Sequence, residues 1–200
     1  MKDTYKTIAF PSPETIFKEK SSTFYGYAFP IESELKVKPI LDVLRKKYPH
    51  AVHYCYAYQI GTESINYRAN DDGEPSNSAG VPIYRQIQSF SLTNILVVVV
   101  RIFGGIKLGV GGLISAYKTS AQVTLESCEL IEKTINCSFL ISFDYKNMNK
   151  VMRILKENKI NSTNQKMGLS CEIEICIRKK IAKKIFEIFD STFEIEIKEI

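Results

Sequence analysis

Residues 71–117 read DDGEPSNSAGVPIYRQIQSFSLTNILVVVVRIFGGIKLGVGGLISAY, which is an acidic turn, an apolar run and a glycine-rich loop in succession. The apolar run, residues 95–100, is far too short to span a bilayer and predicts a buried strand. Half of the ten glycines lie within residues 104–112. We therefore expect this stretch to form the functional surface of the protein.

A helix is expected on each side of the apolar strand. The first runs over about residues 79–90, with Ser78 as its N-cap. The second runs over about residues 113–127, directly after the glycine-rich loop. The order strand, glycine loop, helix places the loop against a helix N-terminus.

The residues before this stretch predict two strands and a further helix. Residues 24–29 are aromatic and favour a strand. Ser33 can cap a helix that ends at about Lys47. Residues 52–60 predict a strand that returns as a hairpin over residues 64–68. On that strand the aromatic residues at 54, 56 and 58 share one face, and His53, Cys55 and Ala57 share the other.

From Thr134 the pattern changes to a strand, a helix, two strands, a helix and a strand. This order over roughly 65 residues is typical of the split βαβ, or ferredoxin-like, arrangement. The sequence therefore predicts an α+β protein with two domains, residues 1–134 and residues 135–200.

Composition and charge set few limits on function. Apolar residues make up 44% and charged residues 24% of the 200 residues, and the net charge is +5. Residues 1–136 hold 15 basic and 13 acidic residues, and residues 137–200 hold 12 and 9, so strong non-specific RNA binding is not expected. No leader or membrane segment is visible, so we expect a cytoplasmic protein without membrane contact. The five cysteines contain no C-x-x-C pair, which argues against a zinc ribbon or a redox dithiol.

The acidic turn has two interpretations. Asp71, Asp72 and Glu74 place three carboxylates within four residues, and such groups repel one another unless a cation or N–H groups offset them. One interpretation is a site for Mg²⁺ or for a partner. The other, favoured by spacing alone, is an Asx-type turn in which Asp72 bonds the backbone of Gly73 and Glu74. We otherwise expect no cofactor.

The glycine-rich loop also has two interpretations, which are of comparable weight. Successive N–H groups in the loop and the following helix N-terminus can hold an anion, with Arg101 and Lys107 as cations. Alternatively, the glycines only allow a tight crossover with positive φ and close packing. The loop matches neither the Walker A motif nor the G-x-G-x-x-G order.

A catalytic nucleophile with an adjacent base is not evident. His53 is one of only two histidines, and a single strand histidine is usually structural unless it shares a cleft with other polar groups. No G-x-S-x-G or H-E-x-x-H signature is present. The sequence therefore favours a binding protein over an enzyme.

The motifs in this stretch resemble the signature of the IMPACT/YigZ family. The resemblance covers about residues 21–127, and the second half is similar by pattern to the small C-terminal domain of the bacterial YigZ branch. Asn77 and Ser78 depart from the usual pattern, as does Ile102. The residues that carry the resemblance are Asp71–Ser76, Ala79, Gly80, Pro82, Asn94, Arg101–Gly109, Gly111–Leu113, Ala116 and Tyr117.

The resemblance implies a first domain with the ribosomal protein S5 domain 2-like fold and a second domain like the last domain of elongation factor G. Both folds recur in proteins that contact ribosomes and RNA, and eukaryotic IMPACT is a regulator of translation. The first hypothesis is therefore a translation-associated regulatory protein that binds RNA, the ribosome or a translation factor.

The second hypothesis is an enzyme that binds phosphate or a nucleotide through the acidic turn and the glycine-rich loop. A third is a scaffold that forms oligomers through the helix at residues 181–189; the sequence leaves the oligomeric state open. The candidate cleft is the same for the first two hypotheses. It comprises His53, Asp71, Asp72, Glu74, Ser76, Arg101, Gly104, Gly105, Lys107, Gly109, Gly111, Gly112 and Tyr117.

Overall fold

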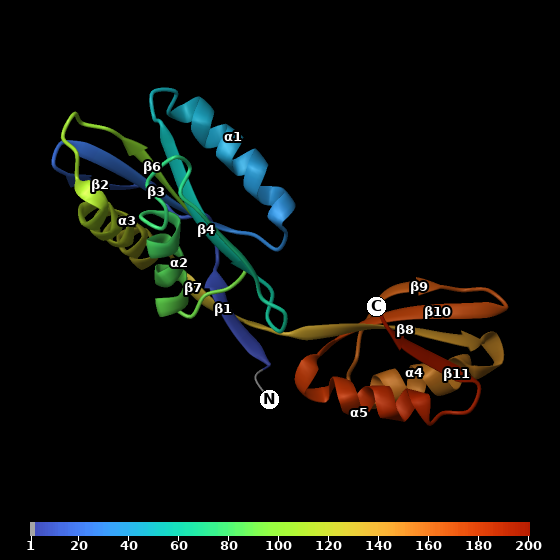
Figure 1. Cartoon of the computed structure of the whole chain (residues 1–200). Coiled ribbons are helices and arrows are strands. Elements are labelled where there is room, and N and C mark those ends of the chain that lie inside the picture. The colour runs from blue at the N-terminus through green and yellow to red at the C-terminus, as the bar shows by residue number, and fades with distance from the viewer. Residues whose placement is uncertain (1–2) are drawn as a thin grey trace. The chain divides into compact units, whose positions relative to one another are not determined.

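The computed structural model describes residues 3–200, which form two compact units (Figure 1). The first unit spans Tyr5–Lys133, and the second contains Thr134–Ile200 together with Asp3 and Thr4. Within the described residues, no helix is long and apolar enough to cross a membrane. Both units combine helices with antiparallel sheets, which confirms the predicted mixture of α and β structure.

The first unit is built on a five-stranded antiparallel sheet with β6 at its centre. Its strand order is β2-β3-β6-β4-β5. The bounds are β2 Thr15–Glu19, β3 Ser22–Pro30, β4 His53–Ile60, β5 Asn66–Asn70 and β6 Ile95–Ile102. A separate two-stranded sheet pairs β1, Thr4–Ile8, with β7, Leu130–Thr134.

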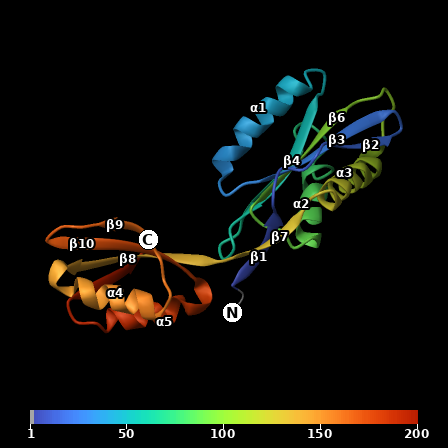
Figure 2. The ribbon, with the colours of Figure 1, turned by 180° about the vertical axis from the view of Figure 1, so that it is seen from behind.

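Helices cover both faces of this sheet. The helix α1, Val37–Lys47, follows the short 3-10 helix η1, Glu34–Lys36, and lies on one face; α2, Gly80–Ser89, and α3, Gly109–Glu126, lie on the other (Figures 1 and 2). Side chains alternate across a strand, so β6 contributes to both cores. Ile95, Val97 and Val99 join the core under α2 and α3, while Leu96, Val98 and Val100 join the core under α1. This two-sided burial explains the uninterrupted apolar run.

The predicted alternation along β4 is confirmed. Tyr54, Tyr56 and Tyr58 pack in the core under α1, whereas Cys55 and Ala57 pack in the core under α2 and α3. His53 begins the strand, so its position is fixed by the same alternation. The strand therefore presents His53 and Cys55 on the α3 side of the sheet.

The second unit follows the predicted order of elements. It consists of β8 Asn136–Asp144, η2 Tyr145–Asn147, α4 Met148–Glu157, β9 Ser162–Lys166, β10 Ser170–Arg178, α5 Lys179–Asp190 and β11 Ile195–Glu199. Its sheet is antiparallel, with the order β11-β8-β10-β9. Both helices pack on one shared core, to which Val151 and Ile185 contribute. The opposite face of β10 carries Glu172 and Glu174.

Candidate functional site

The acidic turn and the glycine-rich loop meet at one depression of about 400 Å³ in the first unit. Five segments supply its walls: the start of β4, the turn before α2, the end of β6, the loop that leads into α3 and the beginning of α3. Its lining residues are His53, Glu74, Pro75, Arg101, Phe103, Lys107, Leu108, Gly109, Val110 and Leu113. The volume lies within the range of about 300–1,000 Å³ that is usual for small-molecule sites.

A buried ion pair forms the centre of the depression. Nη1 of Arg101 donates to Oε1 of Glu74 at 2.6 Å, and the side chains are only 6% and 4% exposed. Nη2 of Arg101 donates to Oγ of Ser22 at 3.3 Å. The guanidinium also lies 5.4 Å from the ring centre of Phe103. Because Arg101 neutralises Glu74, this carboxylate adds little negative charge to the depression.

The buried Tyr117 and Cys55 extend the network below this pair. The hydroxyl of Tyr117 donates to Oε1 of Glu74 at 2.8 Å, and the thiol of Cys55 contacts that hydroxyl at 3.3 Å and the carbonyl of Asp71 at 2.9 Å. Burial raises the pKa of both Tyr117 and Cys55 well above their usual ranges. Neither group is therefore an ionised nucleophile at neutral pH.

His53 contributes an imidazole nitrogen to the same wall. Its Nδ1 lies 2.8 Å from the carbonyl oxygen of Asp72, and since a carbonyl can only accept, Nδ1 carries the hydrogen. Nε2 then faces Oε1 of Glu74 at 4.0 Å, which is too long for a hydrogen bond. In the neutral imidazole Nε2 is a hydrogen-bond acceptor at the depression.

Asp71 caps α2 instead of lining the depression. Its Oδ1 accepts from the N–H groups of Ala79 and Gly80 at 2.9 and 2.8 Å, and its Oδ2 accepts from Asn77 at 2.8 Å. The prediction that Ser78 is the N-cap is wrong. The hydroxyl of Ser78 donates to the carbonyl of Pro75, and the N-cap position is held by Ala79, whose side chain has no acceptor.

The side chain of Asp72 also binds the backbone. Its Oδ2 accepts from the N–H of Tyr54 at 2.7 Å, and its Oδ1 lies 3.9 Å from Arg45. The expected bonding of Asp72 to Gly73 and Glu74 is wrong, because the turn is closed by Asn70, whose Oδ1 accepts from the N–H of Asp72 at 2.8 Å. A short polar side chain two residues earlier performs the Asx role.

The predicted Mg²⁺ site draws no support from this arrangement. The carboxylates of Asp71 and Asp72 accept hydrogen bonds from backbone N–H groups, and Oε1 of Glu74 accepts from Arg101 and Tyr117. Across residues 3–200, no group of three or more histidine, cysteine, aspartate or glutamate side chains is placed to hold a metal ion. The magnesium site stays a prediction.

The glycine-rich loop is shorter than predicted because α3 begins at Gly109, not at Leu113. Gly111 and Gly112 therefore lie in the first turn of the helix. Gly104 is required by packing, since an added Cβ would approach the carbonyl oxygen of Ser21 to 1.9 Å. Gly109 is required by its φ of +72°, which side chains rarely adopt.

Gly111 has neither of these structural reasons. Its φ is not positive, and an added Cβ would meet no atom within 4 Å. Glycine in a helix costs about 1 kcal/mol relative to alanine. Leu108, at the N-cap of α3, supplies no side-chain acceptor. The first N–H groups of α3 are thus left uncapped beside the depression, and no side chain at residue 111 covers them.

The structure brings together some of the predicted site residues and separates others. His53, Glu74, Arg101, Lys107 and Gly109 line the depression, with Tyr117 directly beneath it. Asp71 and Asp72 stabilise the turn, and Ser76 is exposed without contributing to the lining. Gly104 and Gly105 lie in the loop, outside the lining, as do Gly111 and Gly112 in the helix.

Sequence reasoning missed the apolar half of the site. Phe103, Leu108, Val110 and Leu113 line the depression and alternate with the glycines and Lys107 in the sequence. Phe103 and Val110 are 47% and 53% exposed. Large apolar side chains between glycines were the available signal, because a purely structural loop does not need them.

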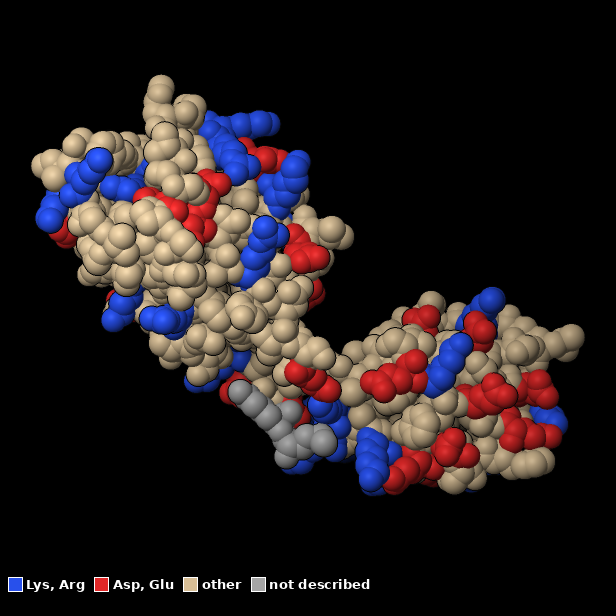
Figure 3. All heavy atoms as spheres, viewed as in Figure 1, with Lys and Arg blue, Asp and Glu red and all other residues tan. Residues whose placement is uncertain are grey.

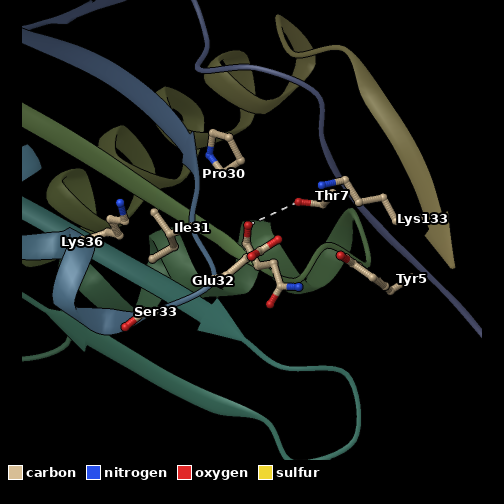
Figure 4. A pocket seen from close by; sticks show the side chains of 9 residues that line it. Tyr5, Thr7, Pro30, Ile31, Glu32, Ser33, Lys36 and Lys133 are labelled. Atoms are coloured by element: carbon tan, nitrogen blue, oxygen red, sulfur yellow. Dashed lines mark hydrogen bonds between the residues drawn. The ribbon is translucent and has the colours of Figure 1, made fainter. Parts of the chain in front are cut away.

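A second cavity of about 490 Å³ lies elsewhere in the first unit and contains none of the predicted site residues. Figure 4 shows Glu32 between Lys36 on one side and Tyr5 and Lys133 on the other, and the hydroxyl of Thr7 donates to the carbonyl of Asn94 at 3.2 Å. Glu32 and both lysines are exposed, so the cavity is a solvated surface feature rather than a preorganised centre.

Comparisons with known proteins match the part of the chain that forms the first depression. A family model described as the Impact N-terminal domain matches residues 20–125, which contain every residue of that depression. An IMPACT family member from Haemophilus influenzae (strain ATCC 51907 / DSM 11121 / KW20 / Rd) is 31% identical over 185 residues, which is 90% of this chain and 88% of the relative.

A second relative and a solved structure extend the comparison. The IMPACT family member YigZ from Escherichia coli (strain K12) is 30% identical over 147 residues, 72% of each chain. A crystal structure of a hypothetical protein aligns with a TM-score of 0.75 and 22% identity over 100% of this chain and 98% of the other. At that identity the structural match shows a shared fold.

Proposed function

This chain belongs to the IMPACT family, and we propose that it is a cytosolic, translation-associated regulatory protein that acts by binding RNA, the ribosome or a translation factor. The binding surface is the depression formed by the acidic turn and the glycine-rich loop. The family's role in translational regulation, implied by the signature, is one support. The geometry of the depression is the other.

The observation that carries the proposal is the state of the polar groups at the depression. Glu74 is paired with Arg101, and Tyr117 and Cys55 are buried and protonated. These groups hold the turn and the loop in place instead of offering an activated nucleophile. Exposed Phe103, Val110 and Lys107 form the accessible rim. An apolar rim with a cation is typical of a surface that binds another molecule.

The fold assignments are part of the proposal. We propose a ribosomal protein S5 domain 2-like fold for the first unit and a ferredoxin-like fold, similar to the last domain of elongation factor G, for the second. The strand order β11-β8-β10-β9, with both helices on one face, supports the second assignment. A similar fold alone does not define a function, so the proposed function depends on the depression in the first unit.

The charge distribution favours moderate, salt-sensitive binding. Figure 3 shows basic and acidic side chains interspersed over the visible face of both units. In the second unit, the open face of the sheet carries Glu172, Glu174 and Glu196, which repel phosphates. Such a surface does not provide the continuous basic field of a strong non-specific RNA binder.

The alternative is an enzyme that binds phosphate or a nucleotide. The uncapped N-terminus of α3 beside Lys107 favours the binding part of this alternative. The reaction itself lacks a candidate nucleophile, because the buried thiol of Cys55 is protonated. We therefore place the binding protein first.

Co-sedimentation with ribosomes and electrophoretic mobility shift with ribosomal RNA test the proposal. The full chain is expected to bind at low salt and to be released as the salt concentration rises. Lys107→Glu reverses a charge at the depression and should weaken binding. Lys198→Glu makes the same change on the open sheet face of the second unit and should leave binding unchanged. Absence of binding in both assays at low salt would contradict the proposal.

A further inference from the structure

Three features of the depression point to an anionic ligand. Among the residues that the structure describes, no side chain caps the first turn of α3, and its leading N–H groups lack intrahelical acceptors. The helix dipole adds partial positive charge at the same place. Lys107 lines the depression and has no ion-pair partner within residues 3–200.

Arg101 supplies independent evidence. Its side chain is only 6% exposed, yet its Nε–H has no hydrogen-bond partner within the part of the chain that the structure describes. A buried donor without an acceptor costs about 1–3 kcal/mol. Arg101 lines the depression, so this unpaired donor belongs to the wall that a bound anion would face.

The absence of a side chain at residue 111 is a further observation. No packing contact and no positive φ requires glycine there, so its cost in helix stability has no structural reason within residues 3–200. A glycine at this position leaves the helix N-terminus open to a ligand that approaches the backbone closely.

The remaining wall of the depression suits a planar apolar group. Phe103 is half-exposed and its ring lies over the Arg101 guanidinium. Stacking of a nucleic-acid base on an aromatic side chain contributes about 1–3 kcal/mol. In the neutral imidazole, His53 Nε2 is an acceptor at the same depression and can accept a hydrogen bond from an exocyclic amino group.

We propose that the depression binds a nucleotide unit that carries a terminal phosphate. The phosphate lies at the N-terminus of α3 beside Lys107, and the base stacks on Phe103. This inference rests on the proposed function, since it names the ligand chemistry of the same surface. The same chemistry is available from a free nucleoside monophosphate or from the phosphorylated end of a single-stranded RNA.

Isothermal titration of the full chain tests the proposal. AMP is expected to bind at least about tenfold more tightly than adenosine, because the phosphate makes the charge-assisted contacts. A short single-stranded RNA with a 5′-phosphate is compared with the same RNA ending in a 5′-hydroxyl. Preference for the phosphorylated RNA over AMP identifies an RNA end as the ligand, and equal affinity identifies the free nucleotide; both outcomes support the shared chemistry.

Gly111→Asp is the decisive variant. The side chain has open space, and a carboxylate in the first turn stabilises a helix, so the variant should fold at least as well as the parent. Its carboxylate adds a negative charge in the first turn of α3, beside the depression, and should reduce AMP affinity by about tenfold or more. Asn149→Asp adds the same charge in the first turn of α4 and should bind AMP as the parent does.

Two results would overturn the inference: no saturable binding of AMP or 5′-phosphorylated RNA, or unchanged AMP affinity in Gly111→Asp. Lys107→Gln provides a second variant that removes a charge without adding one, and it too should weaken AMP binding. Ribosome co-sedimentation of the parent chain without added nucleotide is measured separately. Co-sedimentation without nucleotide binding would reject this inference alone, whereas nucleotide binding without co-sedimentation would reject only the ribosome contact.

Discussion

The N-termini of α2 and α3 belong to the two halves of the same signature, but their N–H groups have different partners. At α2 the carboxylate of Asp71 accepts from Ala79 and Gly80. At α3 no side chain caps the first turn, and Gly111 has open space in front of it. The acidic half therefore completes its own hydrogen bonds, while the glycine-rich half leaves donors available. This difference separates residues that stabilise the surface from residues that can bind.

The largest expected effect comes from the buried ion pair that links the two halves. Arg101→Met leaves the carboxylate of Glu74 buried without its cation and should destabilise the first unit by about 3–5 kcal/mol. Urea unfolding followed by circular dichroism measures the change.

The matched control replaces both partners. Arg101→Met combined with Glu74→Met removes the buried charge as well as its partner, so most of the lost stability should return. A single Arg101→Met variant as stable as the parent would show that the acidic half does not depend on this pair.

Removal of the α2 cap should have the next largest effect. Asp71→Ala deprives three N–H groups of their acceptor and should cost about 2 kcal/mol. Native-state hydrogen exchange should accelerate at Ala79 and Gly80. Asp71→Asn keeps one carbonyl acceptor and should lie between the parent and Asp71→Ala. Unchanged exchange at both amides would contradict the assigned role of Asp71.

Glu14 lies outside both helix N-termini and tests the acid sensitivity of the rest of the first unit. Hydrogen bonds from Lys47, Tyr27 and Tyr48 lower the pKa of Glu14 from 4.5 to about 2. Because folding lowers the pKa of this carboxyl group, the ionised group stabilises the folded protein at pH values above its unfolded pKa. This stability is lost as the pH falls from about 4.5 to about 2. Since 32% of the Glu14 side chain is exposed, solvent screening reduces the contribution to about 1 kcal/mol.

Glu14→Gln should remove this part of the pH dependence, which unfolding midpoints measured at several acidic pH values would show. Any acid sensitivity that remains then belongs to other groups of the chain. An identical pH profile in the parent and the variant would contradict the role of Glu14.

The smallest effect is a gain in stability. Gly111→Ala should stabilise α3 by up to about 1 kcal/mol, because alanine has a higher helix propensity and its Cβ meets no neighbour. Gly104→Ala is the contrasting variant and should destabilise the loop, since its Cβ would overlap the backbone of Ser21. A loss of stability in Gly111→Ala would mean that this glycine has a structural role after all.

The sequence predicted most of the local structure and part of the site. Patterns with a clear period, such as the aromatic face of β4 and the apolar run of β6, follow directly from burial on two faces. The cap of α2 could not be predicted from adjacent residues, because Asp71 lies eight residues before Ala79. The start of α3 was misplaced because the low helix propensity of glycine argues against a helix, although the N–H groups of a first turn need no intrahelical acceptors.

The composition of the depression was predictable only in its polar part. Charged residues and glycines indicate a candidate site in the sequence, whereas Phe103 and Val110 resemble ordinary core residues until their exposure is known. The pairing of β1 with β7 was also missed, because it joins segments more than 120 residues apart. Non-local pairing depends on the tertiary fold rather than on local pattern.

The central position of β6 has a consequence for synthesis of the chain. Its neighbours β3 and β4 precede it in the sequence, and each pairs with β6 rather than with the other. At about 5–20 residues per second, the ribosome completes β4 seconds before it completes β6. During that interval both strands expose unpaired edges, which are prone to aggregation. We expect the nascent chain to need protection until residue 102 has left the exit tunnel, and a chain truncated before β6 to be insoluble.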